Sequence, residues 1–212
     1  MVRRTRRDRP ELRQELLEAA LVEFGAYGYD GASTLAIARR AGAHQPQINY
    51  HFESKEALWR AAVDHVFGQL REALGTAPAP PAASGDLLSL TREVAEYLRR
   101  FVRFAAAHPE LNRIITHEAT TRTPRLDWLV EHHVRRYADA TSALWVRLRD
   151  AGIAAPIDER LLHHVVVGAA SLLFVNAPEF ELLTGEKADD PAWVERHADG
   201  IVRMLLPGAG AI

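Results

Sequence analysis

A short run of polar side chains, between positions 44 and 51, carries the most suggestive chemistry in this sequence. It combines amide, imidazole and phenol groups with almost no fixed charge: His44, Gln45, Gln47, Asn49, Tyr50 and His51. Glutamine and asparagine each present a hydrogen-bond donor beside an acceptor, which suits the N6/N7 edge of adenine in the major groove of DNA. Tyrosine, histidine and the N–H groups of a helix N-terminus suit phosphate oxygens. The run therefore favours recognition of DNA base edges.

Two short helices joined by a glycine are predicted to position this polar run. Ser33 is a favourable N-cap for a two-turn helix with one small, apolar side. Gly42 supplies the positive φ that ends this helix, and Pro46 fits the first turn of the next one, where a lost N–H costs little. Ile48 and Phe52 are four residues apart, so both can face the core and leave the polar run outside. This is a helix-turn-helix pattern, in which the second helix lies in the major groove.

Positive charge flanks the pattern on both sides. Ser54 caps a further helix whose first turn holds Lys55, so an ammonium group and a helix N-terminus can share one phosphate. The first 13 residues hold six arginines against two acidic residues, whereas residues 61–212 hold 16 basic and 20 acidic side chains. An arginine-rich arm adds salt-sensitive affinity for phosphates, and its candidate contacts are Arg3, Arg4, Arg6 and Arg7. The alternative for this arm is a solubilising tail.

The rest of the chain has helical periodicity, and no stretch alternates as a strand between hairpin turns. Apolar side chains repeat at threes and fours in residues 12–24, 58–70 and 87–104, and further helices are predicted at about 110–120, 124–151, 158–176 and 191–206. Residues 75–85, rich in Pro, Ala and Gly, read as a loop. The predicted fold class is all-α. An N-terminal arm and three-helix domain occupy residues 1–54, and a C-terminal helical bundle occupies residues 55–212.

Several motifs follow one another at close spacing between about Leu12 and Val66. They are, in order, Phe24-Gly25-Ala26-Tyr27-Gly28-Tyr29, Ile37-Ala38 with Ala41-Gly42, Tyr50-His51-Phe52 and Ser54-Lys55-Glu56-Ala57-Leu58. Together they resemble the TetR-like (tetracycline-repressor-like) family of transcriptional regulators. The resemblance implies α-helical homodimers that bind palindromic operators and leave them when a small molecule occupies the C-terminal domain.

The same resemblance assigns DNA contacts residue by residue. The matching positions are Ser33, His44, Gln45, Pro46, Gln47, Asn49, Tyr50, His51 and Lys55. Two positions depart from the family pattern, since the family commonly has Ser or Thr in place of His44 and Tyr in place of Asn49. The operator sequence of a relative therefore does not transfer to this chain.

Residues 161–176 are apolar almost all round and are thin at the centre, where Gly168, Ala169 and Ala170 follow one another. The segment resembles the family's dimerisation helix, which pairs with the last helix and with their symmetry mates. The predicted interface comprises Leu161, His164, Val165, Gly168, Ala169, Leu172, Trp193, Ile201 and Leu205. A two-fold protein would place two recognition helices on half-sites about one DNA turn, ~34–36 Å, apart. The alternative is a helix buried within one monomer.

A ligand pocket is expected where aromatic walls and sparse polar groups share the C-terminal helices. The candidates are Phe101, Phe104, His117, Glu118, Thr121, Trp128, His132, Trp145 and Phe174. The alternative for each of them is packing or surface exposure. Residues 108–111 with 124–126, and residues 193–197, are also similar to a subgroup of TetR-like regulators related to a pyrimidine-sensing one. This second resemblance does not name the effector.

Other function classes find little support. The chain has no cysteine, which excludes disulfides and thiolate chemistry, and no cofactor or metal is expected. H-E-x-x-H, G-x-S-x-G and P-loop motifs are absent, which argues against an enzyme. An architectural DNA-binding protein without an effector is the other alternative, although its C-terminal part would be longer than DNA binding and dimerisation need. No apolar run reaches ~18 residues and no signal-peptide pattern opens the chain. The sequence thus predicts a cytoplasmic, ligand-responsive transcriptional regulator, with repression favoured over activation.

Overall fold

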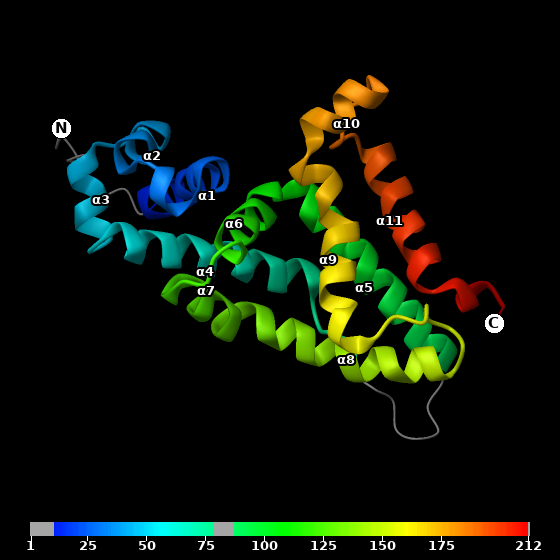
Figure 1. The fold of residues 1–212 in the computed structure, drawn as a ribbon. Coiled ribbons are helices and arrows are strands. Elements are labelled where there is room, and N and C mark those ends of the chain that lie inside the picture. The colour runs from blue at the N-terminus through cyan, green and yellow to red at the C-terminus, as the bar shows by residue number, and fades with distance from the viewer. Residues whose placement is uncertain (1–10, 79–86, 212) are drawn as a thin grey trace, which may run out of the picture. The chain divides into compact units, whose positions relative to one another are not determined.

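The computed structural model describes residues 11–78 and 87–211, and every regular element in these ranges is helical (Figure 1). In chain order the elements are α1 (Leu12–Gly31), α2 (Thr34–Arg40), α3 (Gln45–His51), α4 (Lys55–Leu74), α5 (Leu87–Ala107), α6 (Pro109–Ala119), α7 (Pro124–Leu129), the π-helix η1 (Val130–Val134), α8 (Arg135–Asp150), α9 (Glu159–Val175), α10 (Ala177–Thr184), α11 (Pro191–Leu205) and the 3-10 helix η2 (Pro207–Ala211). The predicted all-α class is confirmed. The four arm arginines, Arg3, Arg4, Arg6 and Arg7, lie outside the described residues, as does most of the predicted loop at 75–85.

The chain divides into two compact units. The first comprises Met1–Gln69 with Glu110–Arg122, and the second comprises Leu70–Pro109 with Thr123–Ile212. The division falls inside α4, so this helix begins in the first unit and ends in the second. The sequence-based division into residues 1–54 and 55–212 is a division by function, and it stays a prediction.

An aromatic cluster joins the end of α1 to the start of α4 within the first unit. The Phe24 and Tyr29 rings stack with centroids 6.0 Å apart, and Tyr29 meets the buried Trp59 edge-on at 6.3 Å. Between the two rings of α1, Gly28 has φ +67° and ψ 179°, a conformation that essentially only glycine adopts. A Cβ at Gly28 would also lie 3.4 Å from Nδ1 of His117 on α6. The kink at Gly28 is therefore what lets Tyr29 face Trp59.

The start of α2 is fixed by two side-chain hydrogen bonds. Oγ of Ser33 accepts from the N–H of Ala36 at 3.4 Å, which confirms the predicted N-cap. The N–H of Ser33 itself donates to Oε1 of Glu23 at 3.1 Å. Glu23 is buried in the first unit, and this bond gives its carboxylate a partner.

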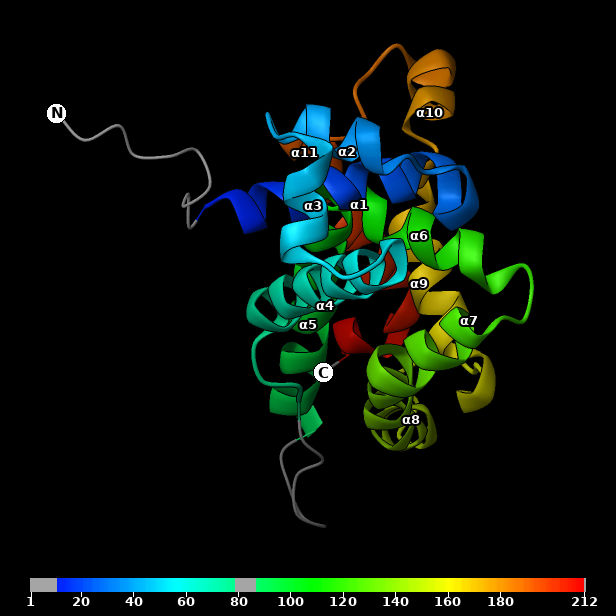
Figure 2. The same cartoon turned by 90° about the vertical axis from the view of Figure 1, so that its left-hand side faces the viewer.

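The turn between α2 and α3 has the geometry that the sequence predicts. Gly42 has φ +62°, and the N–H of Ala43 donates to the carbonyl of Ala38 at 2.8 Å, which closes a Schellman turn. Ile37 and Ile48, one from each helix, are almost fully buried. Figure 2 turns α2 and α3 toward the viewer. The helix-turn-helix prediction is confirmed.

The second unit is organised around α5, which packs against α11 and α9, while α8 packs against α9 (Figure 1). Its core includes Val102, Leu148, Ala170 and Leu205, all of them fully buried. At the surface, both carboxylate oxygens of Glu195 accept from the Arg103 guanidinium, at 2.7 and 2.8 Å. The hydrogen bond to Arg103 lowers the pKa of the Glu195 carboxyl. This bidentate pair ties α11 to α5 outside the apolar core.

Two sequence predictions for this unit need correction. The stretch at 124–151, predicted as one helix, is α7, η1 and α8, because the N–H of Arg135 bonds to the carbonyl of Val130 and inserts one residue into the turn. No helix was predicted for residues 177–184, which form α10, and Leu182 and Leu183 of this helix are 89% and 79% exposed. In the described ranges no single helix is long and apolar enough to cross a membrane. Only α9 and α10 together reach that length, and they bend by 67°.

We expect Gly28→Ala to destabilise the protein by about 1–3 kcal/mol, because alanine cannot adopt the backbone conformation of Gly28 without strain. Urea unfolding followed by far-UV circular dichroism measures the change. Gly31→Ala, three residues later and without a positive φ, is the control and should cost less. Equal free energies of unfolding for the two variants would contradict the role given to the kink.

Candidate DNA-binding surface and ligand pocket

The outer face of α3 presents most of the polar run to solvent. His44, Gln45, Pro46, Asn49 and Tyr50 are exposed, and Gln47 and His51 are half-buried. The Tyr50 side chain is 76% exposed, and its ring packs edge-on against His51 with centroids 5.1 Å apart. Ser33, at the start of α2, is exposed as well. The structure thus gathers the predicted contacts of α2 and α3 in one unit, and their role in DNA binding stays a prediction.

Hydrogen bonds inside this surface distinguish its amide side chains. Oε1 of Gln47 accepts from the N–H of His44 at 2.9 Å, so its acceptor is occupied in stabilising the first turn of α3. Nε2 of Gln45 donates to Oγ1 of Thr34 at 3.4 Å, a long bond between α3 and α2. Asn49 makes no side-chain hydrogen bond to any described residue. Asn49 is therefore the amide with both its donor and its acceptor available to a base.

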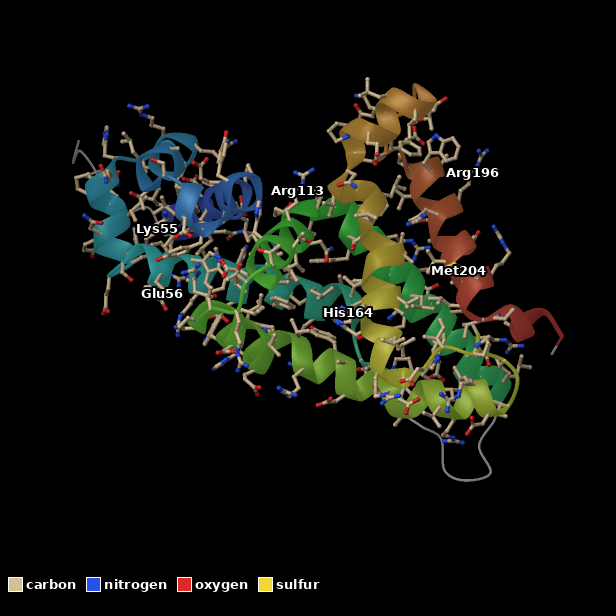
Figure 3. All side chains as sticks on the ribbon, viewed as in Figure 1. Lys55, Glu56, Arg113, His164, Arg196 and Met204 are labelled. Atoms are coloured by element: carbon tan, nitrogen blue, oxygen red, sulfur yellow. The ribbon has the colours of Figure 1, made fainter. Side chains whose placement is uncertain are left out.

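Cationic groups lie at the ends of α2 and α4. Lys55, labelled in Figure 3, donates to the carbonyl of Asp30 at 3.3 Å, and its Nζ lies 5.0 Å from the Tyr29 ring centroid. An ammonium group has three donors, so these contacts position Lys55 and leave it able to bind a phosphate. Arg39 and Arg40, in the last turn of α2, are exposed. Sequence reasoning missed both arginines, although their position in the helix before Gly42 was a usable signal.

The nine predicted pocket residues do not gather around one cavity inside either unit. His117, Glu118 and Thr121 belong to the first unit, and the other six belong to the second. Trp145 and Phe174 are buried in the second core, with Phe101 packed against it, and Phe104 is buried as well. Trp128 of α7 stacks on His132 of the π-helix η1, with ring centroids 5.1 Å apart. Core packing accounts for most of the aromatic members of this set.

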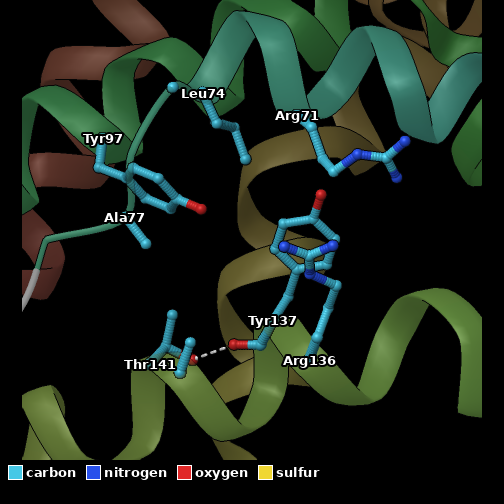
Figure 4. Close-up of a pocket in the computed structure, with 9 residues that line it drawn as sticks. Arg71, Leu74, Ala77, Tyr97, Arg136, Tyr137 and Thr141 are labelled. Carbon is cyan, nitrogen blue, oxygen red and sulfur yellow. Dashed lines mark hydrogen bonds between the residues drawn. The ribbon is translucent and has the colours of Figure 1, made fainter.

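A pocket of about 390 Å³ does lie in the second unit (Figure 4). It is lined by Arg71, Leu74, Gly75, Ala77, Tyr97, Arg136, Tyr137, Ala140 and Thr141. None of the nine predicted pocket residues lines it. The signal in the sequence was the Arg136-Tyr137 pair one turn before Thr141. The pair was missed because the predicted pocket was built mainly from tryptophan, histidine and phenylalanine.

The two tyrosines of this pocket are hydrogen-bond donors at neutral pH. Burial raises the pKa of Tyr97 to about 12, and burial also raises the pKa of Tyr137 against the opposing charge of Arg136. Figure 4 shows the Tyr97 hydroxyl directed into the pocket and the Arg136 guanidinium across the Tyr137 ring, whose centroid lies 5.5 Å from Cζ of Arg136. Oγ1 of Thr141 donates to the carbonyl of Tyr137 at 2.9 Å. The pocket thus combines aromatic faces, neutral hydroxyls and cations.

Two buried polar side chains on α4 were not predicted as part of any site. Nε2 of His65 and Oε1 of Gln69 are buried without a hydrogen-bond partner among the described residues, which is uncommon. The two residues are four apart and share one face of the helix. Water or a polar ligand is expected to satisfy them.

The predicted dimer residues separate into an exposed and a buried set. Leu161 and Leu172 are 57% and 58% exposed, and His164 and Gly168 are exposed between them on α9. Val165, Ala169 and Trp193 are half-buried, whereas Ile201 and Leu205 lie inside the core of the second unit and leave almost no surface to a partner. Figure 3 labels His164 on α9, and Arg196 and Met204 on α11. The exposed set forms one stripe along α9, at spacings of three and four.

Comparison with known proteins identifies the class of this chain. Residues 16–62 match the family described as bacterial regulatory proteins, tetR family, and residues 91–205 match the tetracyclin repressor-like C-terminal domain. The chain belongs to the TetR family, as the motifs from Leu12 to Val66 indicated. It is therefore a ligand-responsive helix-turn-helix transcriptional regulator.

Individual relatives cover almost the whole chain. HTH-type transcriptional regulator RutR of Escherichia coli strain K12 is 27% identical over 199 residues, which are 92% of this chain and 89% of that protein. The crystal structure of apo AibR matches with a TM-score of 0.69 at 19% identity and covers 93% of this chain and 99% of AibR. AibR in complex with isovaleryl coenzyme A and operator DNA matches with a TM-score of 0.65 at 20% identity, again over 93% of this chain and 99% of AibR. The similarity therefore extends well beyond the helix-turn-helix.

We expect Asn49→Ala to relax sequence preference at one base position of each half-site, by about 1–3 kcal/mol of discrimination, because a bidentate amide contact is lost. Selection from a random duplex library, followed by sequencing, gives the binding-site profile. An unchanged profile would contradict the base-reading role of Asn49.

Arg40→Ala is the control for that experiment, because Arg40 is exposed in the last turn of α2, outside the recognition helix α3, and we expect it to contact phosphate. Its affinity should fall for all sequences alike. The slope of log K against log salt should become shallower by about one for each phosphate contact removed. The sequence profile of Arg40→Ala should match that of the unaltered protein.

Proposed function

We propose that the chain is a homodimeric repressor that binds a palindromic operator and is released from it by a small-molecule effector. The observation that carries this proposal is the outer face of α3, where Asn49, Gln45 and Tyr50 stand exposed on a buried apolar anchor. Uncharged groups of this kind discriminate base edges, while Arg39, Arg40 and Lys55 supply contacts to phosphate. The proposed DNA contacts further include Ser33, His44, Pro46, Gln47, His51 and the arm arginines Arg3, Arg4, Arg6 and Arg7.

The proposed dimer uses the exposed stripe of α9. Leu161 and Leu172 expose more than half of their surface to solvent, which is unfavourable for large apolar side chains on one face of a helix. A partner helix would cover them. A Cβ added at Gly168 meets no atom within 4 Å, so the protomer itself does not require glycine there. Close approach of a partner helix would require it. Duplication then presents two α3 helices to two half-sites.

The proposed effector acts through the second unit and through α4. This helix begins next to the recognition surface and ends at the pocket, to which it contributes Arg71 and Leu74. A ligand that favours one position of the last turn of α4 would change the affinity for operator. AibR, solved in complex with isovaleryl coenzyme A and operator DNA, supports binding of a ligand and of DNA by one chain of this fold. In the proposed division, residues 1–54 bind DNA, and residues 55–212 bind the ligand and form the dimer.

Regulation accounts for the chain better than the other two classes. An architectural DNA-binding protein would have no use for a pocket in the second unit. An enzyme is opposed by membership of a family of regulators. Since the proposed partner is operator DNA, the proposed place of action is the cytoplasm, where bacterial DNA is accessible.

Gly168→Leu tests the dimer. We expect the variant to fold, because its side chain points into open space within the protomer, and to elute as a single subunit in light-scattering chromatography. Operator affinity should fall roughly 100-fold or more, because the two half-sites are then bound independently. Arg92→Leu places a leucine at an exposed position of α5 and should leave both measurements unchanged. A dimeric Gly168→Leu protein with full operator affinity would overturn this interface.

An effector and the operator should weaken each other by the same factor, because both equilibria are linked through one protein. A compound that raises the melting temperature of the protein should therefore raise the Kd for operator DNA. Fluorescence anisotropy, at saturating and zero compound, measures this factor from the DNA side, and calorimetry measures it from the ligand side. Binding of a compound with no effect on operator affinity would remove the sensor from this proposal.

A further inference from the structure

The pocket of the second unit has the size of a metabolite site. Its volume of about 390 Å³ lies within the ~300–1,000 Å³ typical of small-molecule pockets. The last turn of α4 with the segment that follows it, Tyr97 of α5 and the first half of α8 form its walls. All of its lining residues belong to one unit.

The lining of this pocket is cationic without a compensating carboxylate. Arg71 and Arg136 contribute two guanidinium groups, and no lining residue is acidic. Neither arginine forms an ion pair with any carboxylate in the described residues. Other arginines of the unit behave differently, since Arg135, next to Arg136, pairs with Glu131, and Arg103 pairs with Glu195. Two arginines without an ion pair among the described residues thus line one cavity, whereas Arg135 and Arg103 are paired.

We propose that this pocket binds a small organic anion, with its acidic group held by Arg136 and Arg71 and its apolar body against the Tyr97 ring. The proposal deepens the proposed function and rests on it only for the consequence on DNA binding. A guanidinium binds carboxylate or phosphate oxygens through paired N–H donors. The neutral hydroxyl of Tyr97, which is directed into the pocket, donates a further bond to the same oxygens. Leu74, Ala77 and Ala140 complete an apolar wall too small for a large cofactor.

The end of α4 is held in a way that makes it responsive to such a ligand. Nη1 of Arg100 donates to the carbonyl of Leu74 at 3.1 Å and so caps the C-terminus of the helix. Leu74 and Arg71, in the same turn, line the pocket. An anion bound to Arg71 therefore contacts the same turn that the Arg100 hydrogen bond holds in place. Binding of the ligand can then change the position of the end of α4.

The test uses the full chain and three probes: benzoate, its uncharged amide benzamide, and inorganic phosphate. We expect millimolar benzoate to raise the melting temperature and to give a measurable Kd by calorimetry, while benzamide of the same shape binds at least roughly tenfold more weakly, because a hydrogen bond to a charged group is lost. Binding of benzoate should weaken as salt rises, because the arginines are exposed. Protection by phosphate alone assigns the pocket to phosphorylated ligands, and protection by benzoate alone assigns it to carboxylates.

Variants locate the site. Arg136→Gln should lose roughly tenfold or more in benzoate affinity, and Arg136→Lys should restore part of it, because the charge returns without the paired donors. Arg92→Gln removes one exposed arginine of α5 outside the pocket and should bind benzoate normally. Unchanged melting temperatures of the unliganded variants establish that the fold is intact.

Several outcomes would overturn the anion site. They are equal binding of benzoate and benzamide, no binding of either anion at millimolar concentration, and full benzoate affinity in Arg136→Gln. A separate outcome concerns the proposed function. Benzoate binding that depends on Arg136 but leaves operator affinity unchanged would confirm the anion site and contradict effector release.

Discussion

The recognition surface depends on the burial of two side chains, Ile48 and Phe52, because a seven-residue helix has no stability of its own in water. Their burial fixes which arc of α3 faces outward, and the Schellman turn at Gly42 fixes the direction in which the helix leaves α2. The kinked end of α1 then secures the start of α4 through Tyr29 and Trp59. This apolar support keeps the polar side chains of α3 on the outside of the unit.

How far the sequence predicts this structure depends on whether a feature is local. Ser33, Gly42 and Pro46 act through their own backbone, so the helix-turn-helix was predictable from them and is confirmed. The single helix predicted at 124–151 was wrong because the π-turn at Val130 inserts a residue without changing which side chains are apolar. The full set of pocket residues was missed for a different reason. Arg71, Tyr97 and Arg136 are distant in sequence, and only the packing of three helices brings them to one cavity.

The same distinction applies to single site residues. The same base-reading role was predicted for Gln47 and Asn49, since both are amides on the predicted outer face of the helix. The structure separates them, because the side chain of Gln47 bonds to the backbone of its own helix and that of Asn49 does not. Likewise, Ile201 and Leu205 shared the apolar pattern of a partner-facing helix, but they fill the protomer's own core. Periodicity identifies an apolar face, and it cannot say whether the atoms that cover it belong to the same chain.

The hydrogen bond from the His44 N–H to Gln47 bears on how this lineage can acquire new target genes. Evolution at position 47 is constrained, because replacing the amide removes a hydrogen bond that stabilises the first turn of α3 together with any base contact. The side chains at positions 45, 49 and 50 make no comparable hydrogen bond to the backbone of α3, so these positions tolerate substitution. Diversification of promoters among descendants should therefore proceed by exchange at those three sites, and a laboratory effort to retarget the protein as a biosensor would begin with a library there.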